Sequence, residues 1–177
     1  SYRGLMIDLS RMWHDLESIR NVIDLASLYK IKYLQLHLSD DQAFVFPSDS
    51  FPNLPTPDRP YTKKDFIKLV DYAKVRGVTI VPEIDVPGHS RQFIETYPEI
   101  FDVDNGVKKS NVINIANEKV YSALDEIIGE VAEVFYNSPF IHMGAAAAKL
   151  DFYKNVKEVK SFMKKNKLGN DVHELYR

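Results

Sequence analysis

The sequence contains no cysteine, and its 177 residues carry a formal net charge of only −2. Without cysteine the chain forms no disulfide, offers no thiolate nucleophile and gives zinc no sulfur ligand, and its redox compartment stays open. The near balance of 23 basic and 25 acidic residues makes no electrostatic case for nucleic acid or an anionic membrane as a partner. No apolar run reaches the length of a transmembrane span, and we expect no signal peptide because the chain opens on a strand-like segment at 4–9.

Several motifs that mark common enzyme classes are also missing. No glycine-rich phosphate loop follows the first strand-like segment, which leaves a nucleotide-binding domain with little support. No Gly-x-Ser-x-Gly elbow occurs, so an acyl-transfer hydrolase is disfavoured. Suitable metal ligands are present at His37, Asp40, Asp41, Asp85 and His89, but no His-x-His or His-Glu-x-x-His spacing joins them. We therefore expect neither a metal nor another cofactor.

The composition and the apolar periodicity predict alternating strands and helices. Apolar residues make up 45% of the chain and aromatic residues 12%, which is enough for a hydrophobic core. Short apolar runs predict strands at 4–9, 33–38, 78–84 and 140–143. Apolar residues at helical spacing predict helices at 16–29, between Thr62 and Gly77, at 117–136 and at 149–165.

Smaller elements and one long loop complete this pattern. Thr62 is the expected N-cap of the second helix, with Asp65 at the capping-box distance. A short helix is expected at 90–97 and an extended piece at 112–115. The loop at 39–61 has five prolines within fourteen residues, and a loop of this length is typical of a functional excursion.

The fourfold repetition of strand and helix predicts the α/β class with a parallel sheet. Two architectures fit this repetition. A complete doubly wound sheet matches the length, and so do the first four β/α units of a (β/α)8 TIM barrel, since a whole barrel needs about 250 residues. No internal repeat or linker divides the sequence, so we expect residues 1–177 to belong to one domain.

Polar side chains cluster where the expected strands end. They are Asp8 and Arg11 at or just past the end of the first strand, His37, Asp40 and Asp41 at the end of the second, Glu83, Asp85 and His89 at the end of the third, and His142 at the end of the fourth. In a parallel sheet these ends share one edge, which is where ligands bind in both architectures. Polar groups at all four ends therefore favour a functional site.

Each of these residues also has a structural interpretation. Asp8 suits a buried, hydrogen-bonded carboxylate, and His37 suits a histidine whose hydrogen bonds are satisfied within the core. Asp85 and His89 could cap the loop around the Pro-Gly turn between them. Arg11 could pair locally with Asp8 or Asp15.

Four ordered motifs carry a resemblance to a known family. They are Arg-Gly-Leu-Met-Ile-Asp-Leu-Ser-Arg at 3–11, His-Leu-Ser-Asp-Asp-Gln at 37–42, the pair of segments at 61–65 and 81–90, and His-Met-Gly-Ala at 142–145. In this order they resemble the first four strand motifs of the exo-β-N-acetylhexosaminidases, glycoside hydrolase family 20. The resemblance spans nearly the whole chain. It implies a (β/α)8 TIM barrel of which this chain covers about the first four β/α units.

The resemblance implies that a terminal β-linked N-acetylglucosamine or N-acetylgalactosamine is removed by a substrate-assisted, retaining mechanism. The substrate's own acetamido oxygen attacks the anomeric carbon, so the enzyme needs a general acid and a carboxylate that orients the acetamide. Arg11 and Asp40 correspond to positions that bind the sugar. Asp85, His89 and His142 correspond to positions that orient and tune the acid from behind it.

The departures from the family concern the reacting groups. The family's fourth motif ends in an adjacent Asp and general-acid Glu, and this chain has Ala146 and Ala147 there. Both lie in a run of four alanines at 145–148, which we interpret as an engineered replacement or as positions whose side chains are not recorded. The second motif also departs, with Gln-Ala-Phe at 42–44 where the family has Gln-Gly-Trp. We therefore expect weak binding and no turnover.

The resemblance also implies the partners. The expected partner is a glycan with a terminal N-acetylhexosamine, and the open edges of half a barrel would favour self-association. Members of the family are often secreted, periplasmic or lysosomal. Two alternatives stay open: a carbohydrate-binding barrel fragment without catalysis, which the alanines favour, and an unrelated flavodoxin-like α/β domain.

Overall fold

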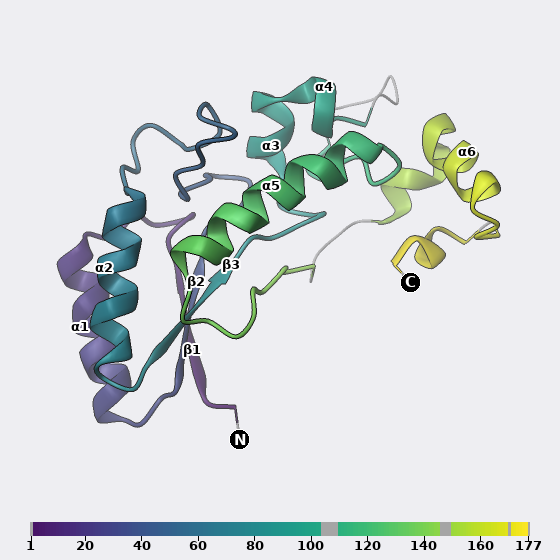
Figure 1. Cartoon of the computed structure of the whole chain (residues 1–177). Coiled ribbons are helices and arrows are strands. Elements are labelled where there is room, and N and C mark those ends of the chain that lie inside the picture. Colours follow the sequence, from purple (N-terminus) through teal and green to yellow (C-terminus); the bar gives the residue numbers. More distant parts are fainter. Residues whose placement is uncertain (1, 104–109, 146–149, 170, 177) are drawn as a thin grey trace.

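The architecture is built on a parallel sheet with helices packed against it (Figure 1). The computed structural model describes residues 2–103, 110–145, 150–169 and 171–176. Three strands pair in chain order: β1 (Gly4–Asp8), β2 (Tyr33–His37) and β3 (Thr79–Glu83). Both pairings are parallel and a helix lies between successive strands, which confirms the α/β class and three of the expected strands.

The prediction of a fourth strand at 140–143 is wrong, because this segment forms no regular strand. His142 makes one isolated parallel bridge to Glu83, so the segment does lie beside β3 on its outer edge. Past this bridge, among the described residues, only the Val86 N–H still donates to the segment, to the Met143 carbonyl, and no regular ladder follows because Gly144 and Ala145 both have positive φ, 64° and 65°. That left-handed conformation turns the backbone out of the extended path that a ladder requires.

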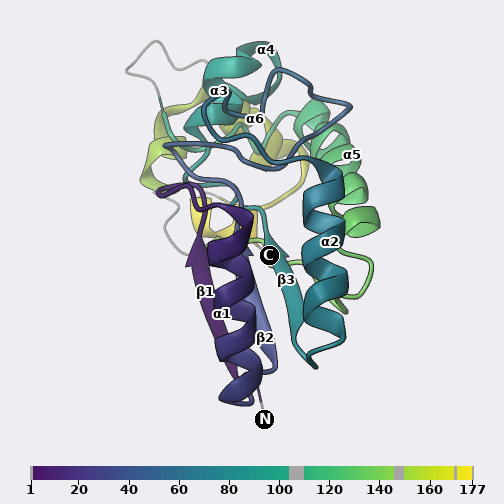
Figure 2. The ribbon, with the colours of Figure 1, turned by 90° about the vertical axis from the view of Figure 1, so that its left-hand side faces the viewer.

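Helices α1 (Leu16–Leu28) and α2 (Lys63–Lys74) lie side by side across one face of the sheet (Figure 2). Helix α2 begins with the expected capping box, in which the Thr62 side chain accepts from the Asp65 N–H and the Asp65 carboxylate accepts from the Thr62 N–H. The core between helices and sheet is apolar and includes Ile19, Ile23, Ala26, Leu34, Leu36, Phe66, Leu69, Val70 and Ile80. This packing fixes the sheet face that points away from the helices as the one free for a site.

In its described residues, the connection from β3 to His142 contains three helices. They are α3 (Arg91–Thr96), α4 (Pro98–Phe101) and α5 (Glu118–Val134). These confirm the helices expected at 90–97 and 117–136. The extended piece expected at 112–115 is wrong, because the side chains of Ser110 and Asn114 hydrogen-bond the neighbouring backbone N–H groups and favour a turn.

The C-terminal region has a small core of its own. Its elements are the 3-10 helices η1 (Leu150–Asn155) and η2 (Val172–Tyr176) and the helix α6 (Lys157–Lys165). The single helix expected at 149–165 is wrong in its first part, because Val156 has an extended backbone (ψ 119°) that separates η1 from α6. Tyr153 is fully buried and packs with neighbours that include Val103 and Val112. No helix within the described residues is long and apolar enough to cross a membrane.

Candidate active site

Three functional side chains sit in one register row of the sheet. Asp8 at the end of β1 pairs with His37 at the end of β2, and His37 pairs with Glu83 at the end of β3. Register partners in a sheet point to the same face, and here it is the face opposite α1 and α2. Because each strand ends at this row, the loops that follow bring the other polar residues to the same edge.

Arg11 is held between two carboxylates at this edge. Its Nη1 donates to Asp8 Oδ2 at 2.5 Å, and its Nη2 lies 2.5 Å from Asp40 Oδ2. The other Asp8 oxygen accepts the backbone N–H groups of Ser10 and Arg11, so the turn after β1 is fixed as well. The Arg11 side chain is still 45% exposed. A rigid, exposed fork of donors is suited to adjacent hydroxyl groups of a sugar.

Asp40 is buried and fully partnered. Its side chain is 1% exposed. Oδ2 lies 2.9 Å from His37 Nε2 and also contacts Arg11 Nη2, and Oδ1 accepts a hydrogen bond from the Asp41 N–H at 2.7 Å. The neighbouring Asp41 turns away from this cluster, because its carboxylate accepts from the Arg91 N–H and from Asn111 Nδ2. Asp41 therefore ties two loops together.

His37 lies between two carboxylates. Its Nε2 faces Asp40, and its Nδ1 lies 3.0 Å from Glu83 Oε2. Burial opposes a charge on His37, but the hydrogen bonds to Glu83 and Asp40 outweigh it and raise the pKa of His37 to about 9. Burial also opposes the charge on Glu83, while the hydrogen bonds from His37 and Gln35 lower its pKa overall. The pair is therefore an imidazolium and a carboxylate at neutral pH.

Asp85 hydrogen-bonds the backbone directly before the two alanine positions, 146 and 147. Its Oδ1 accepts the Ala145 N–H at 2.9 Å, and its Oδ2 lies 2.7 Å from His89 Nδ1. The Asp85 N–H donates to Ser39 Oγ at 2.7 Å, which fixes the start of this loop. His142 reaches the same cluster from the side, with Nδ1 3.2 Å from Glu83 Oε1.

The structure thus brings together most of the residues expected at the site. Arg11, Asp40, Asp85, His89 and His142 form one network of hydrogen bonds and ion pairs with Asp8, His37 and Glu83. Ala146 and Ala147 lie outside the described residues. Whether any of these residues binds sugar or serves catalysis stays a prediction.

Sequence reasoning gave no role to Gln35 or Arg59. Gln35 donates to Glu83 Oε2 at 2.7 Å, and Arg59 donates to the Ser10 carbonyl beside Arg11. Gln35 had a detectable pattern, because it precedes His37 by two residues and so faces the same side of β2. Arg59 had none, since it reaches the site across a long loop.

His37, Asp40 and Asp85 offer ligand atoms within 4.8 Å of one another, a spacing that a metal ion would also need. Both ring nitrogens of His37 are already directed at carboxylates, however. A metal ligand needs a free lone pair on the ring. We therefore identify no metal site among the described residues.

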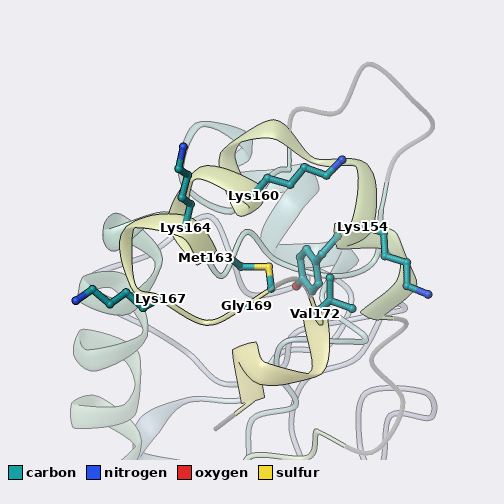
Figure 3. A pocket seen from close by; sticks show the side chains of 8 residues that line it. Lys154, Lys160, Met163, Lys164, Lys167, Gly169 and Val172 are labelled. Carbon is teal, nitrogen blue, oxygen red and sulfur yellow. The ribbon is translucent and has the colours of Figure 1, made fainter.

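The cavities among the described residues that lie outside the register row include two sizeable ones. The larger, about 630 Å³, is formed by η1, α6 and η2 and is lined by Tyr153, Lys154, Lys160, Met163, Lys164, Lys167, Gly169 and Val172. Its lysines contribute their aliphatic stems and point their ammonium groups outward (Figure 3). A second, apolar cavity of about 530 Å³ borders the site through Pro87, Met143 and Ala145. Neither offers the polar cluster that recognises a sugar.

Comparison with known proteins identifies the family. The family model described as "Glycosyl hydrolase family 20, catalytic domain" matches residues 1–177. The chain belongs to glycosyl hydrolase family 20. The family's enzymes are glycoside hydrolases, and this membership removes the flavodoxin-like alternative.

Curated family 20 proteins resemble the chain along most of its length. It is 28% identical over 184 residues to the beta-hexosaminidase subunit beta of Homo sapiens, a match that covers 99% of this chain and 33% of that protein. It is 34% identical over 173 residues to the beta-hexosaminidase of Vibrio furnissii, covering 81% of this chain and 28% of that protein. The chain therefore spans about a third of the length of these relatives.

Solved family 20 structures share the fold. A chitobiase from Flavobacterium johnsoniae superimposes with a TM-score of 0.89 at 30% identity, covering 99% of this chain and 28% of that one. An exo β-N-acetylglucosaminidase from Vibrio harveyi, solved in complex with N-acetylglucosamine, gives a TM-score of 0.87 at 27% identity, covering 98% of this chain and 32% of that one. The α/β fold is therefore that of the family's catalytic domain.

Proposed function

We propose that the chain forms about the first four β/α units of a family 20 catalytic barrel, with residues 1–177 as one partial domain. The supporting observations are three parallel strands in chain order and a fourth segment that bridges to β3 at His142. The site at the carboxyl ends of the strands is where barrel enzymes carry their chemistry. The relatives, which are about three times as long, have room for the remaining units.

We infer that the site recognises the non-reducing terminal N-acetylhexosamine of a glycan. The observation that carries this is Arg11, whose guanidinium is fixed by Asp8 and Asp40 and yet remains open to solvent. In this proposal Arg11 donates to adjacent sugar hydroxyls. Asp40 acts through Arg11, because its own oxygens are occupied by protein donors.

The proposed reaction is a retaining, substrate-assisted hydrolysis. The acetamido oxygen of the bound sugar attacks the anomeric carbon as the glycosidic oxygen receives a proton from a general acid, and water then opens the cyclic intermediate. The acid and the acetamide-orienting carboxylate belong at the positions of Ala147 and Ala146. Asp85 supports this assignment, because it anchors the N–H of Ala145, the residue directly before them.

A second candidate function follows from the same two alanines. A chain without the acid has no proton donor at position 147, which favours sugar binding without hydrolysis. The two functions share Arg11 and differ only in turnover.

Calorimetric titration of the 177-residue chain with N-acetylglucosamine tests the shared binding site. Arg11→Ala should weaken binding by several kcal/mol if two hydroxyls are lost, at about 1.5–3 kcal/mol for each charged hydrogen bond. Arg3→Ala is the matched control, because Arg3 is exposed and donates to the Lys30 carbonyl at the opposite end of the strands. Equal affinities for the chain and for Arg11→Ala would refute the sugar site.

A further inference from the structure

We propose that His37 is a positioning residue that works as an imidazolium: it holds Asp40, and through Asp40 it holds Arg11, in the geometry that receives the ligand. The sugar as ligand rests on the proposed function. The protonation of His37 and its effect on Arg11 can be measured without any sugar.

The geometry of the His37 ring carries this proposal. A neutral imidazole has one N–H and one lone pair, so it can donate to only one of two acceptors. His37 has a carboxylate oxygen on each side, Asp40 Oδ2 at 2.9 Å and Glu83 Oε2 at 3.0 Å. The ring is 5% exposed, so water has little access to replace either contact. Both nitrogens therefore have to donate, and the ring carries a positive charge.

The two carboxylates have further donors that keep them ionised. Asp40 also accepts hydrogen bonds from Arg11 Nη2 and the Asp41 N–H, and Glu83 also accepts one from Gln35 Nε2. A carboxylate that accepts several N–H groups resists protonation. The proton consequently stays on the ring of His37 rather than moving to either carboxylate.

The charged groups around the ring all belong to the strand ends. Asp8 faces it from β1, Asp40 from the turn after β2, and Glu83 from β3, while a carboxylate oxygen of Asp85, in the loop after β3, lies within 4.8 Å of a ring nitrogen. Beyond Asp40 lie Arg11 and His89, and beyond Glu83 lies His142. His37 therefore sits centrally among four carboxylates, with the permanent cation Arg11 on the outer side of Asp40.

Loss of the proton from His37 Nε2 would disturb Asp40 directly. One ring nitrogen would then present a lone pair to a carboxylate oxygen, and the contact would change from attractive to repulsive. Since the same Asp40 oxygen binds both His37 and Arg11, a shift of Asp40 releases the Arg11 fork. The chain of effects runs from the buried ring to the exposed guanidinium.

Nitrogen NMR of the 15N-labelled chain tests the charge directly. Long-range correlation spectra should show both His37 ring nitrogens in the N–H form at pH 7, with a transition near pH 9. The Arg11 Nη2–H signals should be slow to exchange below that pH and should exchange faster above it, because Nη2 is the atom that contacts Asp40. A His37 ring with one N–H and one lone pair at pH 7 would overturn the proposal.

Two conservative variants separate positioning from simple stability. The amide of His37→Gln reaches about as far as Nε2 and keeps a donor for Asp40, whereas His37→Asn reaches about as far as Nδ1 and keeps one for Glu83. Protection of the Arg11 Nη2–H groups should survive better in His37→Gln than in His37→Asn. Equal protection in both variants, each shown to be folded by circular dichroism, would contradict a path through Asp40. His173→Gln is the control, since His173 is exposed in η2.

Binding of N-acetylglucosamine tests whether the positioning of Arg11 by His37 matters for the proposed function. Affinity should be about tenfold lower at pH 10 than at pH 8, as expected for one proton lost near pH 9, and His37→Gln should lack this decline. A pH-independent affinity in the unsubstituted chain would show that His37 does not position the ligand. A chain that shows the NMR transition and binds no sugar at pH 7 would refute the proposed function and leave the positioning of Arg11 intact.

Discussion

Gly144 is required because of a single side chain, Asp85. Its φ is +64°, and a Cβ added there would lie 2.0 Å from Asp85 Oδ1. Gly144→Ala should therefore cost more than the roughly 1–2 kcal/mol of a left-handed backbone alone, because Asp85 must also move off the Ala145 N–H. Urea unfolding measures the loss. Gly77→Ala is the control, since Gly77 has φ +70° with nothing within 4 Å, and an equal loss in both variants would contradict the steric argument.

His37 should make the stability of the fold depend on alkaline pH. Its pKa is about 9 in the folded chain and close to the ordinary 6.5 in the unfolded chain. A raised pKa stabilises the fold fully below pH 6.5, and that contribution is lost as the pH rises through 9. The free energy of unfolding should fall by at most about 3 kcal/mol between pH 6 and pH 10. In His37→Gln the urea midpoint should change much less, and an equal change would contradict the assignment.

The residues of the site were predictable to an uneven degree. Arg11, His37 and Asp40 lie at or just past the ends of strand-like runs, so the rule that parallel strands end at one edge was enough to bring them together. The sequence did not show that Asp40 is buried behind Arg11 or that Asp41 points elsewhere. Adjacent residues after a strand diverge according to backbone turns, and those depend on contacts with distant loops.

At the scale of elements, α5 holds the long loop between β2 and α2 in place through hydrogen bonds, and it forms an ion pair with the start of α2. Glu130 of α5 accepts the N–H groups of Asp49 and Ser50 at 2.8 Å, accepts from Ser48 Oγ, and lies 2.9 Å from Lys63 Nζ. The far end of the same loop holds the turn of Arg11 through Arg59 and the Ser10 carbonyl. The loop is therefore held by hydrogen bonds at two places, one to α5 and the other to the turn that carries Arg11.

Glu130→Gln should weaken these contacts between α5 and the loop. Burial opposes the charge on Glu130, but the hydrogen bonds from Ser50 and Lys63 outweigh it and lower its pKa to about 2. A lowered pKa gives stability that is present above pH 4.5 and is lost as the pH falls towards 2. The variant should lose about 2 kcal/mol at pH 7 and less at pH 3, measured by urea unfolding. Glu133→Gln, exposed on the same helix, should lose little at either pH.

Elements with local causes were predicted well, and those with distant causes were not. Helices α2 and α5 have their caps and apolar stripes within their own sequence, so periodicity located them. The segment at 140–143 looked like a strand, but its pairing ends at Gly144, where the backbone turns to meet Asp85. The break at Val156 has a similar origin, because Val156 is buried in the small C-terminal core.

At the scale of the whole molecule, the sheet has an open edge. β1 pairs only with β2 among the described strands, and Leu5 and Met6 on it are 41% and 53% exposed. Unpaired edges with apolar side chains favour association. The 177-residue chain should therefore show concentration-dependent association in analytical ultracentrifugation, and Met6→Lys should reduce it. A chain that stays monomeric at high concentration would contradict this expectation.

The last prediction concerns turnover. The chain should not hydrolyse aryl β-N-acetylglucosaminides, because a positioned general acid contributes about 10²–10⁴-fold and position 147 is alanine. Placed in a protein that supplies the rest of a family 20 barrel, Ala146→Asp with Ala147→Glu should create a retaining hydrolase. Ala147→Glu alone should recover only part of kcat/KM, because the acetamide would lack its orienting carboxylate.

Arg11→Ala in the doubly substituted protein should then lower kcat/KM for gluco and galacto substrates alike, since both present the same 3-hydroxyl to Arg11. Full efficiency without Arg11 would make it a structural residue and would remove the basis of the proposed sugar site.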